Sequence, residues 1–192
     1  MARSIDIGER RRTVSDAAAR VLARNGLGAL SVRGVAAEAG LPPSTVRYVF
    51  PTQASVRTHA LETVFDATAR RVDAVPDTLS DRERARRILL ELLPLDEERL
   101  VELDVYLALG NAALTDPELR PALDRVVSDM QEWTERIVHL VGVPDADRAY
   151  EARRLHALVD GLAMHVSRLA PGESADWAIE LLDRHLDGLA AR

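Results

Sequence analysis

Apolar residues recur at helical spacing along almost the whole chain, and this periodicity constrains the fold more than any other feature. They return at intervals of three and four residues, which places them on one face of a helix. No stretch shows the sustained alternation, or the β-branched and aromatic enrichment, that strands need. The sequence therefore predicts an all-α fold.

Capping residues and prolines divide this periodicity into about nine helices. The predicted helices cover about 10–24, 32–39, 43–50, 52–72, 81–93, 96–114, 116–142, 146–170 and 175–189. Only the start of the seventh stays open. A Thr115–Glu118 capping box favours an early start, whereas Pro121, a proline past the first turn of such a helix, favours a start near Arg120.

Charge is distributed unevenly along the 192 residues, whose net charge is −6. Residues 1–57 carry nine arginines against four acidic residues, a net charge of +5, and the rest of the chain carries −11. This asymmetry indicates a basic module that meets a polyanion, followed by an acidic body. The chain has no cysteine, which excludes disulfides, thiolate metal sites and cysteine nucleophiles.

A helix-turn-helix is predicted where two short helices flank a glycine turn. The first is 32–39, with Ser31 as N-cap, and Gly40 supplies the positive φ of the turn. The second is 43–50, opened by prolines that suit a first helical turn. Val46 and Phe50 hold this second helix on the core, so its remaining side chains face outward.

At this point the chain resembles the TetR family of regulators. The matching residues are Ala17, Leu22, Gly26, 30–33, Val35, Ala36, 39–41, 44–46, Phe50 and Pro51. Looser matches at 93–98, 112–120 and 159–163 resemble the BetI-type branch of that family. The resemblance implies a DNA-binding domain over 1–57, a linking helix over about 52–72, and a ligand-binding and dimerisation domain over 58–192. Arg47 and Gln53 depart from the family pattern, which usually has tyrosine and a phosphate-binding lysine there.

Eight residues are predicted to bind the DNA: Ser31, Arg33, Pro43, Ser44, Thr45, Arg47, Tyr48 and Thr52. Arg47 is expected to pair with guanine in the major groove, with a purely phosphate contact as the alternative. Tyr48 is expected to contact the DNA backbone, or else to pack on the following helix. Helix N-termini at Ser31 and Thr52 favour phosphate, and the arginines at 10–12 add sequence-independent attraction.

The resemblance further implies a homodimeric, ligand-responsive repressor that binds a palindromic DNA operator and is released by an apolar or amphipathic small molecule. The candidate pocket residues are Tyr106, Asn111, Met130, Trp133, His156 and Met164. The candidate dimer residues, on the broad apolar stripes of the last two helices, are Leu155, Leu162, Val166, Leu182, His185 and Leu186. His156, Asp160 and His165 are too few for a metal site, so none is expected.

Two other classes of protein compete with a regulator. A helical enzyme would need a nucleophile with its base, a metal cluster or a phosphate loop, and no such motif is present. A helical adaptor that binds only protein leaves the basic N-terminal part unexplained. No cofactor is expected. No apolar run is long enough for a membrane span or a secretory signal, so we expect a cytoplasmic protein without a membrane partner.

Overall fold

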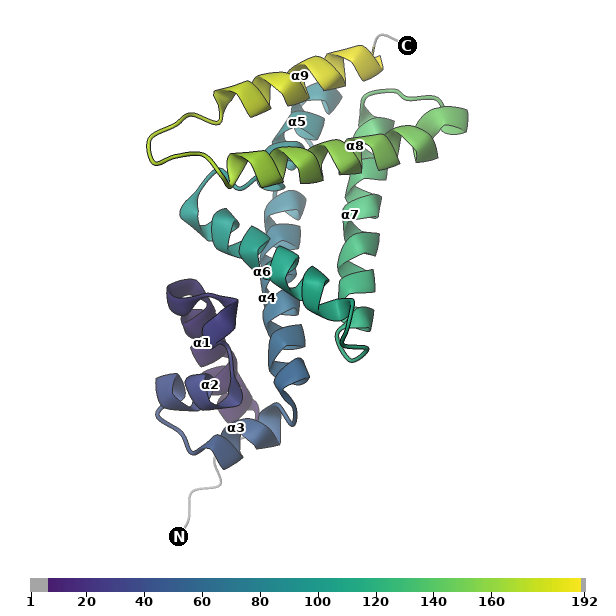
Figure 1. Ribbon diagram of the computed structural model, residues 1–192. Helices are drawn as coiled ribbons and strands as arrows, with labels where there is room; N and C mark the ends of the chain where they lie inside the picture. Colours follow the sequence, from purple (N-terminus) through teal and green to yellow (C-terminus); the bar gives the residue numbers. More distant parts are fainter. Residues whose placement is uncertain (1–6, 191–192) are drawn as a thin grey trace. The chain divides into compact units, whose positions relative to one another are not determined.

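The computed structural model describes residues 7–190, and in that range the chain has nine α-helices, one short 3₁₀ turn and no strand (Figure 1). In chain order the elements are α1 (Ile7–Asn25), η1 (Leu27–Ala29), α2 (Val32–Ala39), α3 (Pro43–Val49), α4 (Gln53–Asp73), α5 (Asp81–Glu91), α6 (Glu97–Ala113), α7 (Arg120–Leu140), α8 (Asp145–Val166) and α9 (Asp176–Ala190). The predicted all-α fold class is confirmed.

These helices form two compact units whose boundaries pass through α4, α6 and α7. The first unit combines the chain up to Phe65 with Asp104–Leu123, and the second combines Asp66–Leu103 with the chain from Asp124 onward. The predicted domains, 1–57 and 58–192, follow the sequence motif rather than this packing, and that division stays a prediction.

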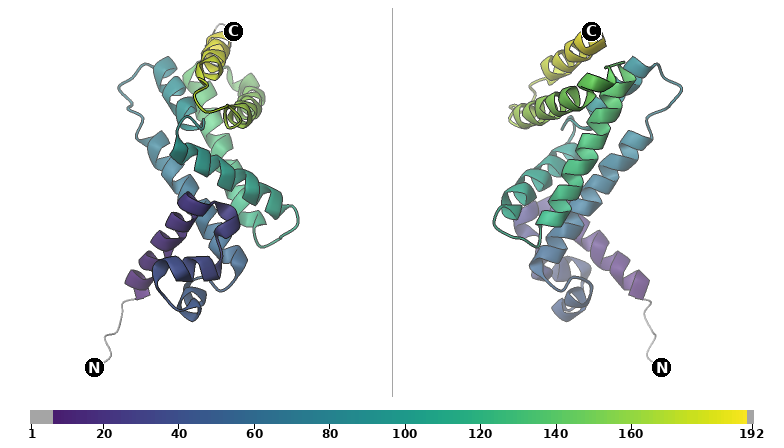
Figure 2. Two further views of the ribbon diagram at one scale, coloured as in Figure 1. Left: turned by 60° about the vertical axis from the view of Figure 1, so that its left-hand side comes forward. Right: turned by 90° about the vertical axis from the view of Figure 1, so that its right-hand side faces the viewer.

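The first unit is organised around α1, α2 and α3, which cluster together in Figure 2. Its core is apolar and includes Val14, Ala17, Ala18, Val21, Leu30, Val35, Ala36, Val46, Phe50 and Val56. The ring of Phe50, which ends α3, lies 4.9 Å from the ring of His59 on α4. Burying a side chain of this size contributes about 1.5–3 kcal/mol, so Phe50 fixes α3 against its neighbours.

The start of α7 is the point that the sequence left open, and the helix begins at Arg120. Pro121 then lies in the first turn, where a missing N–H breaks no helical hydrogen bond. The predicted Thr115–Glu118 capping box is wrong. The Thr115 hydroxyl donates back to the carbonyl of Ala112, and the Glu118 N–H donates to Asp116 Oδ1 instead.

In the second unit, α8 and α9 run antiparallel, joined by the turn around Gly172 (Figure 1). Arginines of α5 hold α9 through ion pairs: Arg82 contacts Asp183 and Asp187, and Arg86 contacts Asp183. At the end of α4, Arg71 forms a two-pronged bond to Glu102 of α6 and a third bond to Glu91 of α5. None of the described helices is both long and apolar enough to cross a membrane.

Most of the predicted dimer residues are buried inside the single chain, and their role in a dimer stays a prediction. The buried ones are Leu155, Leu162, Val166, Leu182 and Leu186, each at most 6% exposed, and His185 is half-buried. The apolar stripes of α8 and α9 therefore supply the core of their own unit. Side chains this deeply buried offer little surface to a partner, so a dimer on these helices would rely mainly on other side chains.

Candidate functional site

The helix-turn-helix is held by local interactions that the sequence predicted. Ser31 caps α2, accepting a 3.0 Å hydrogen bond at its Oγ from the N–H of Gly34. Gly40 adopts a φ of 64°, and the N–H of Leu41 then bonds back to the carbonyl of Ala36. α2 therefore ends at this glycine, and α3 begins three residues later at Pro43.

Six of the eight predicted DNA contacts are exposed, and Ser31 and Thr45 are half-buried. Tyr48 is 66% exposed, so only a minor part of its side chain packs against the rest of the chain. Arg33, Arg47 and Tyr48 make no side-chain hydrogen bond or ion pair within the described part of the chain. Their polar groups are therefore available to a ligand.

Thr52 is the exception, because its side chain already has partners. Its Oγ1 accepts a 3.0 Å hydrogen bond from the N–H of Ser55, which caps α4 as predicted. The same hydroxyl donates to Oε2 of Glu118, 3.3 Å away. A carboxylate thus lies beside the first turn of α4.

The arginines of α1 fall into two groups. Arg20 and Arg24 pair with Glu38 of α2 at 2.6 and 3.5 Å, and the hydrogen bond from Arg20 lowers the pKa of the Glu38 carboxyl. These two arginines join α1 to α2. Arg11 and Arg12 are exposed and Arg10 is half-buried, and none of the three pairs with another described residue, so this predicted cluster is free to attract an anion.

Two tight contacts around the turn before α2 could not be predicted from the sequence. The side-chain amide of Gln53 donates a hydrogen bond to the carbonyl of Leu30, tying α4 to the residue before the Ser31 cap. A Cβ added to Gly34 would lie only 2.6 Å from the carbonyl oxygen of Ala29. The departure of Gln53 from the family pattern was visible in the sequence, but its partner was not.

The predicted pocket residues are divided between the two units. Met130 and Trp133 on α7 are buried, and His156 and Met164 on α8 are half-buried; all four belong to the second unit. The other two belong to the first unit. There, Tyr106 lies 5.8 Å from the ring of Phe65, and Asn111 is exposed.

On α8, His156 and Asp160 face each other across one helical turn. Nε2 of His156 is buried without a hydrogen bond and lies 3.6 Å from Oδ2 of Asp160. Burial raises the pKa of the Asp160 carboxyl, and the charge of His156 opposes that rise. Among the described residues, no three His, Asp or Glu side chains come together as metal ligands.

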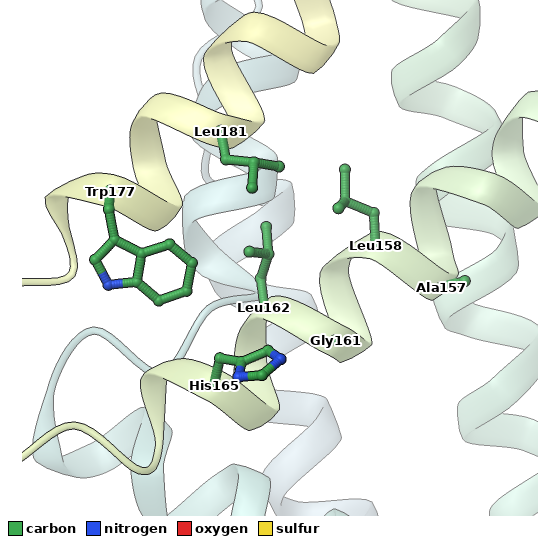
Figure 3. Close-up of a pocket in the computed structure, with 7 residues that line it drawn as sticks. All are labelled: Ala157, Leu158, Gly161, Leu162, His165, Trp177 and Leu181. Carbon is green, nitrogen blue, oxygen red and sulfur yellow. The ribbon is translucent and has the colours of Figure 1, made fainter.

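An apolar hollow of about 420 Å³ lies between α8 and α9 and is open to solvent (Figure 3). It is lined by Ala157, Leu158, Gly161, Leu162, His165, Trp177 and Leu181. Trp177 and Leu181 are 41% and 39% exposed, although both side chains are large and apolar. The ring of His165 lies edge-on to Trp177, with 6.5 Å between the centroids.

A helix-turn-helix with an outward-facing recognition helix, followed by a larger helical bundle, defines the class of helical DNA-binding transcription regulators. Residues 14–56 match the family described as "Bacterial regulatory proteins, tetR family", and residues 81–191 match "BetI-type transcriptional repressor, C-terminal". This chain belongs to the TetR family and is a transcriptional regulator, not an enzyme.

Individual relatives agree with this assignment. The HTH-type transcriptional regulator PksA of Bacillus subtilis is 33% identical over 168 residues, which cover 86% of this chain and 82% of PksA. A putative regulator from Saccharomonospora viridis, in complex with choline, is 25% identical with a TM-score of 0.76, covering 94% of this chain and 96% of that one. The multidrug binding protein EbrR, complexed with ethidium, is 34% identical with a TM-score of 0.65, covering 92% and 98%.

Proposed function

We propose that this regulator is a repressor that binds a palindromic operator as a homodimer and leaves it when a small molecule binds among helices α5 to α8. The observation that carries the proposal is the set of exposed, unpaired polar groups of Arg33, Arg47 and Tyr48 on α2 and α3. In water these groups keep their hydrogen bonds to solvent, so the lack of an internal partner costs little free energy. Their donors therefore remain available to a partner that supplies acceptors.

Within the operator complex, Arg47 is the residue that reads sequence. A guanidinium in the major groove can donate two parallel hydrogen bonds to O6 and N7 of guanine. Thr45 touches a thymine methyl or a phosphate, and Ser44 lies beside it on the same helix. Ser31, Arg33, Pro43, Tyr48 and Thr52 surround them and fix the register through the phosphates.

The test is binding to the DNA upstream of the regulator's own gene, followed by fluorescence anisotropy. The expected result is tight, salt-sensitive binding with two chains per site, and binding to a scrambled duplex weaker by at least a factor of about 10³. Equal affinity for both duplexes would contradict operator recognition, and a complete lack of binding would contradict the DNA-binding role.

The dimer is proposed to form through the hollow on α8 and α9. A monomer in water gains nothing from holding Trp177 and Leu181 exposed, whereas an interface buries both. Ala157 and Gly161 carry almost no side chain, so the helices of a second copy can approach closely. A two-fold axis through this face suits a palindromic site.

The effector is proposed to be an organic cation. Residues 58–192 carry a net charge of −11, and the partly exposed carboxylate of Asp160 on α8 lies 3.6 Å from Nε2 of His156. Two similar structures hold cations, choline in one and ethidium in the other. The candidate pocket residue Trp133 on α7 adds an aromatic ring, whose π face can attract a cation.

Calorimetry with choline and with ethidium tests the effector class. Binding of either to the free protein, with no binding of a neutral molecule of similar size, supports the proposal. The operator complex should then be titrated with choline alone, because ethidium binds duplex DNA by itself. Choline and operator should weaken each other's affinity by the same factor, in the range of about 5 to 150. A regulator of this kind acts where the chromosome is, so we propose a cytoplasmic location.

A further inference from the structure

Arg57, in the second turn of α4, is a half-buried arginine that the DNA-binding residues above do not include. Its Nε is buried without a hydrogen bond, and no ion pair or hydrogen bond joins its side chain to another described residue. A partly buried arginine normally offsets its lost hydration with hydrogen bonds to carboxylate or carbonyl oxygens. Here the stem is packed while the charge has no partner in the described chain.

The position of Arg57 on α4 directs this charge toward the N-terminal end of the helix. It follows Gln53 by four residues, so the two side chains share one face, about 6 Å apart along the axis. Helical side chains lean toward the N-terminus of their helix. Only Nε of the guanidinium is enclosed, so the two terminal nitrogens reach solvent beyond the packed stem.

The amide of Gln53 identifies what lies at that end of the face. It donates to the carbonyl of Leu30, the residue immediately before the Ser31 cap of α2. Gln53 is neutral and its amide is occupied by this bond. It therefore adds no charge to the surface between the first turns of α2 and α4. Arg57 is the next side chain on the same face, one turn further along α4.

We propose that Arg57 binds a phosphate of the DNA backbone next to the first turn of α2. This inference rests on the DNA binding proposed above and extends it with a contact that carries no sequence information. The phosphate supplies the acceptors that the guanidinium lacks within the described chain, and the packed stem holds the guanidinium in place before DNA arrives.

The experiment compares wild type with Arg57→Gln on operator and scrambled duplexes between 50 and 200 mM salt. Loss of one phosphate contact lowers the slope of log affinity against log salt by about 0.9. The affinity of R57Q should therefore fall by the same factor on both duplexes, and that factor should shrink about three- to fourfold across the salt range. Arg70→Gln, the same change at an exposed position of α4, should leave the slope unchanged.

Two further variants separate a phosphate contact from a structural role. Arg57→Lys should keep most of the slope, and Gln53→Lys in the R57Q background should restore it, because a cation returns to the same face. A wild-type slope in R57Q would overturn the assignment, even with reduced affinity, since the residue would then act only through folding. If wild type itself shows no salt-dependent DNA binding, the proposed function and this inference fail together.

Discussion

The hydroxyl of Thr52 donates a hydrogen bond to Oε2 of Glu118, 3.3 Å away, which places a carboxylate from the segment before α7 beside the first turn of α4. Helix N-termini favour anions, so this carboxylate occupies a position that also suits a phosphate. If Thr52 contacts DNA, Glu118 competes with the DNA for the same hydroxyl. Through this hydrogen bond, Glu118 in the segment between α6 and α7 would then lower the affinity for DNA.

Replacing Glu118 by Gln should therefore raise the affinity for operator. Removing one exposed like charge near a phosphate is worth about 0.5–1 kcal/mol, or roughly a two- to fivefold gain. Anisotropy at 50 mM salt measures it, and the gain should fade as salt rises. Glu97→Gln, at the exposed start of α6, serves as the control and should change little. An E118Q variant that binds more weakly would show that the bond positions Thr52 rather than blocking it.

Arg47→Ala should weaken operator binding much more than binding to scrambled DNA, by roughly 1–3 kcal/mol if the contact is bidentate to guanine. Arg47 is exposed on α3 and has no partner in the described chain, so its loss should leave the fold intact. Arg12→Ala on α1 is the contrasting variant, with equal small losses expected on both duplexes. If R47A behaves in the same way as R12A, Arg47 is only a phosphate contact.

Gly34→Ala should destabilise the helix-turn-helix, although alanine is the better helix former. The added Cβ would meet the Ala29 carbonyl oxygen at 2.6 Å, and relief requires the backbone of η1 to move. Overpacking of this kind costs typically about 1–3 kcal/mol. The matched control is Gly188→Ala on α9, where nothing lies within 4 Å of the new Cβ and a gain of about 0.5–1 kcal/mol is expected. Thermal unfolding of both variants gives the comparison.

Local chemistry accounts for the features that the sequence predicted correctly. Ser31, Gly40 and Thr52 act on backbone groups within a few residues, so the residue types and their spacing are enough to assign their roles as caps and turn. The same reasoning placed Arg47 and Tyr48 outward, because helical spacing fixes which side chains share a face with the core residues Val46 and Phe50.

Interactions between segments that are far apart in the sequence could not be predicted in this way. The Gln53–Leu30 bond, the Thr52–Glu118 bond and the clash that forbids a side chain at Gly34 all depend on tertiary placement. The predicted dimer residues stay a prediction for a related reason. Periodicity shows that a helix has an apolar face, but it cannot say whether that face, as at Leu182, meets the chain's own core or a second copy.

The exposed apolar face of α8 and α9 gives a different prediction for the dimer. Trp177→Arg combined with Leu181→Arg should yield a folded monomer, because both side chains are about 40% exposed and tolerate charge in the single chain. Val127→Arg on α7, at another 39% exposed apolar position, should leave the dimer intact. Sedimentation velocity distinguishes the species. A double variant that remains dimeric would place the interface elsewhere.

Leu182→Arg completes this comparison as the buried counterpart of the surface variants. Leu182 is 2% exposed, and a charge there would be buried without a partner, at a cost of about 3 kcal/mol or more. Loss of the cooperative thermal transition, rather than a clean monomer, is the expected outcome.

Asp160→Asn should separate ligand binding from stability. Burial raises the pKa of Asp160 in the folded chain, so the folded state holds this proton more tightly than the unfolded state. The protonated carboxyl therefore stabilises the fold at pH values below the ordinary pKa of aspartate. This stabilisation is lost as the pH rises through the raised pKa. Above the raised pKa the ionised carboxylate destabilises the folded chain, and asparagine removes this effect, so in that pH range D160N should unfold at a slightly higher temperature than wild type and lose that part of the pH dependence.

The same variant should bind choline more weakly, by a factor of roughly two to five for one partly exposed charge pair. Calorimetry on both proteins measures this, and Asp147→Asn, at an exposed position in the first turn of α8, is the control that should match wild type. If D160N is more stable than wild type and binds choline more weakly, Asp160 contributes to ligand binding at the expense of stability. If D160N is more stable and binds choline as tightly as wild type does, the cation is held by other groups and Asp160 is not its counter-ion.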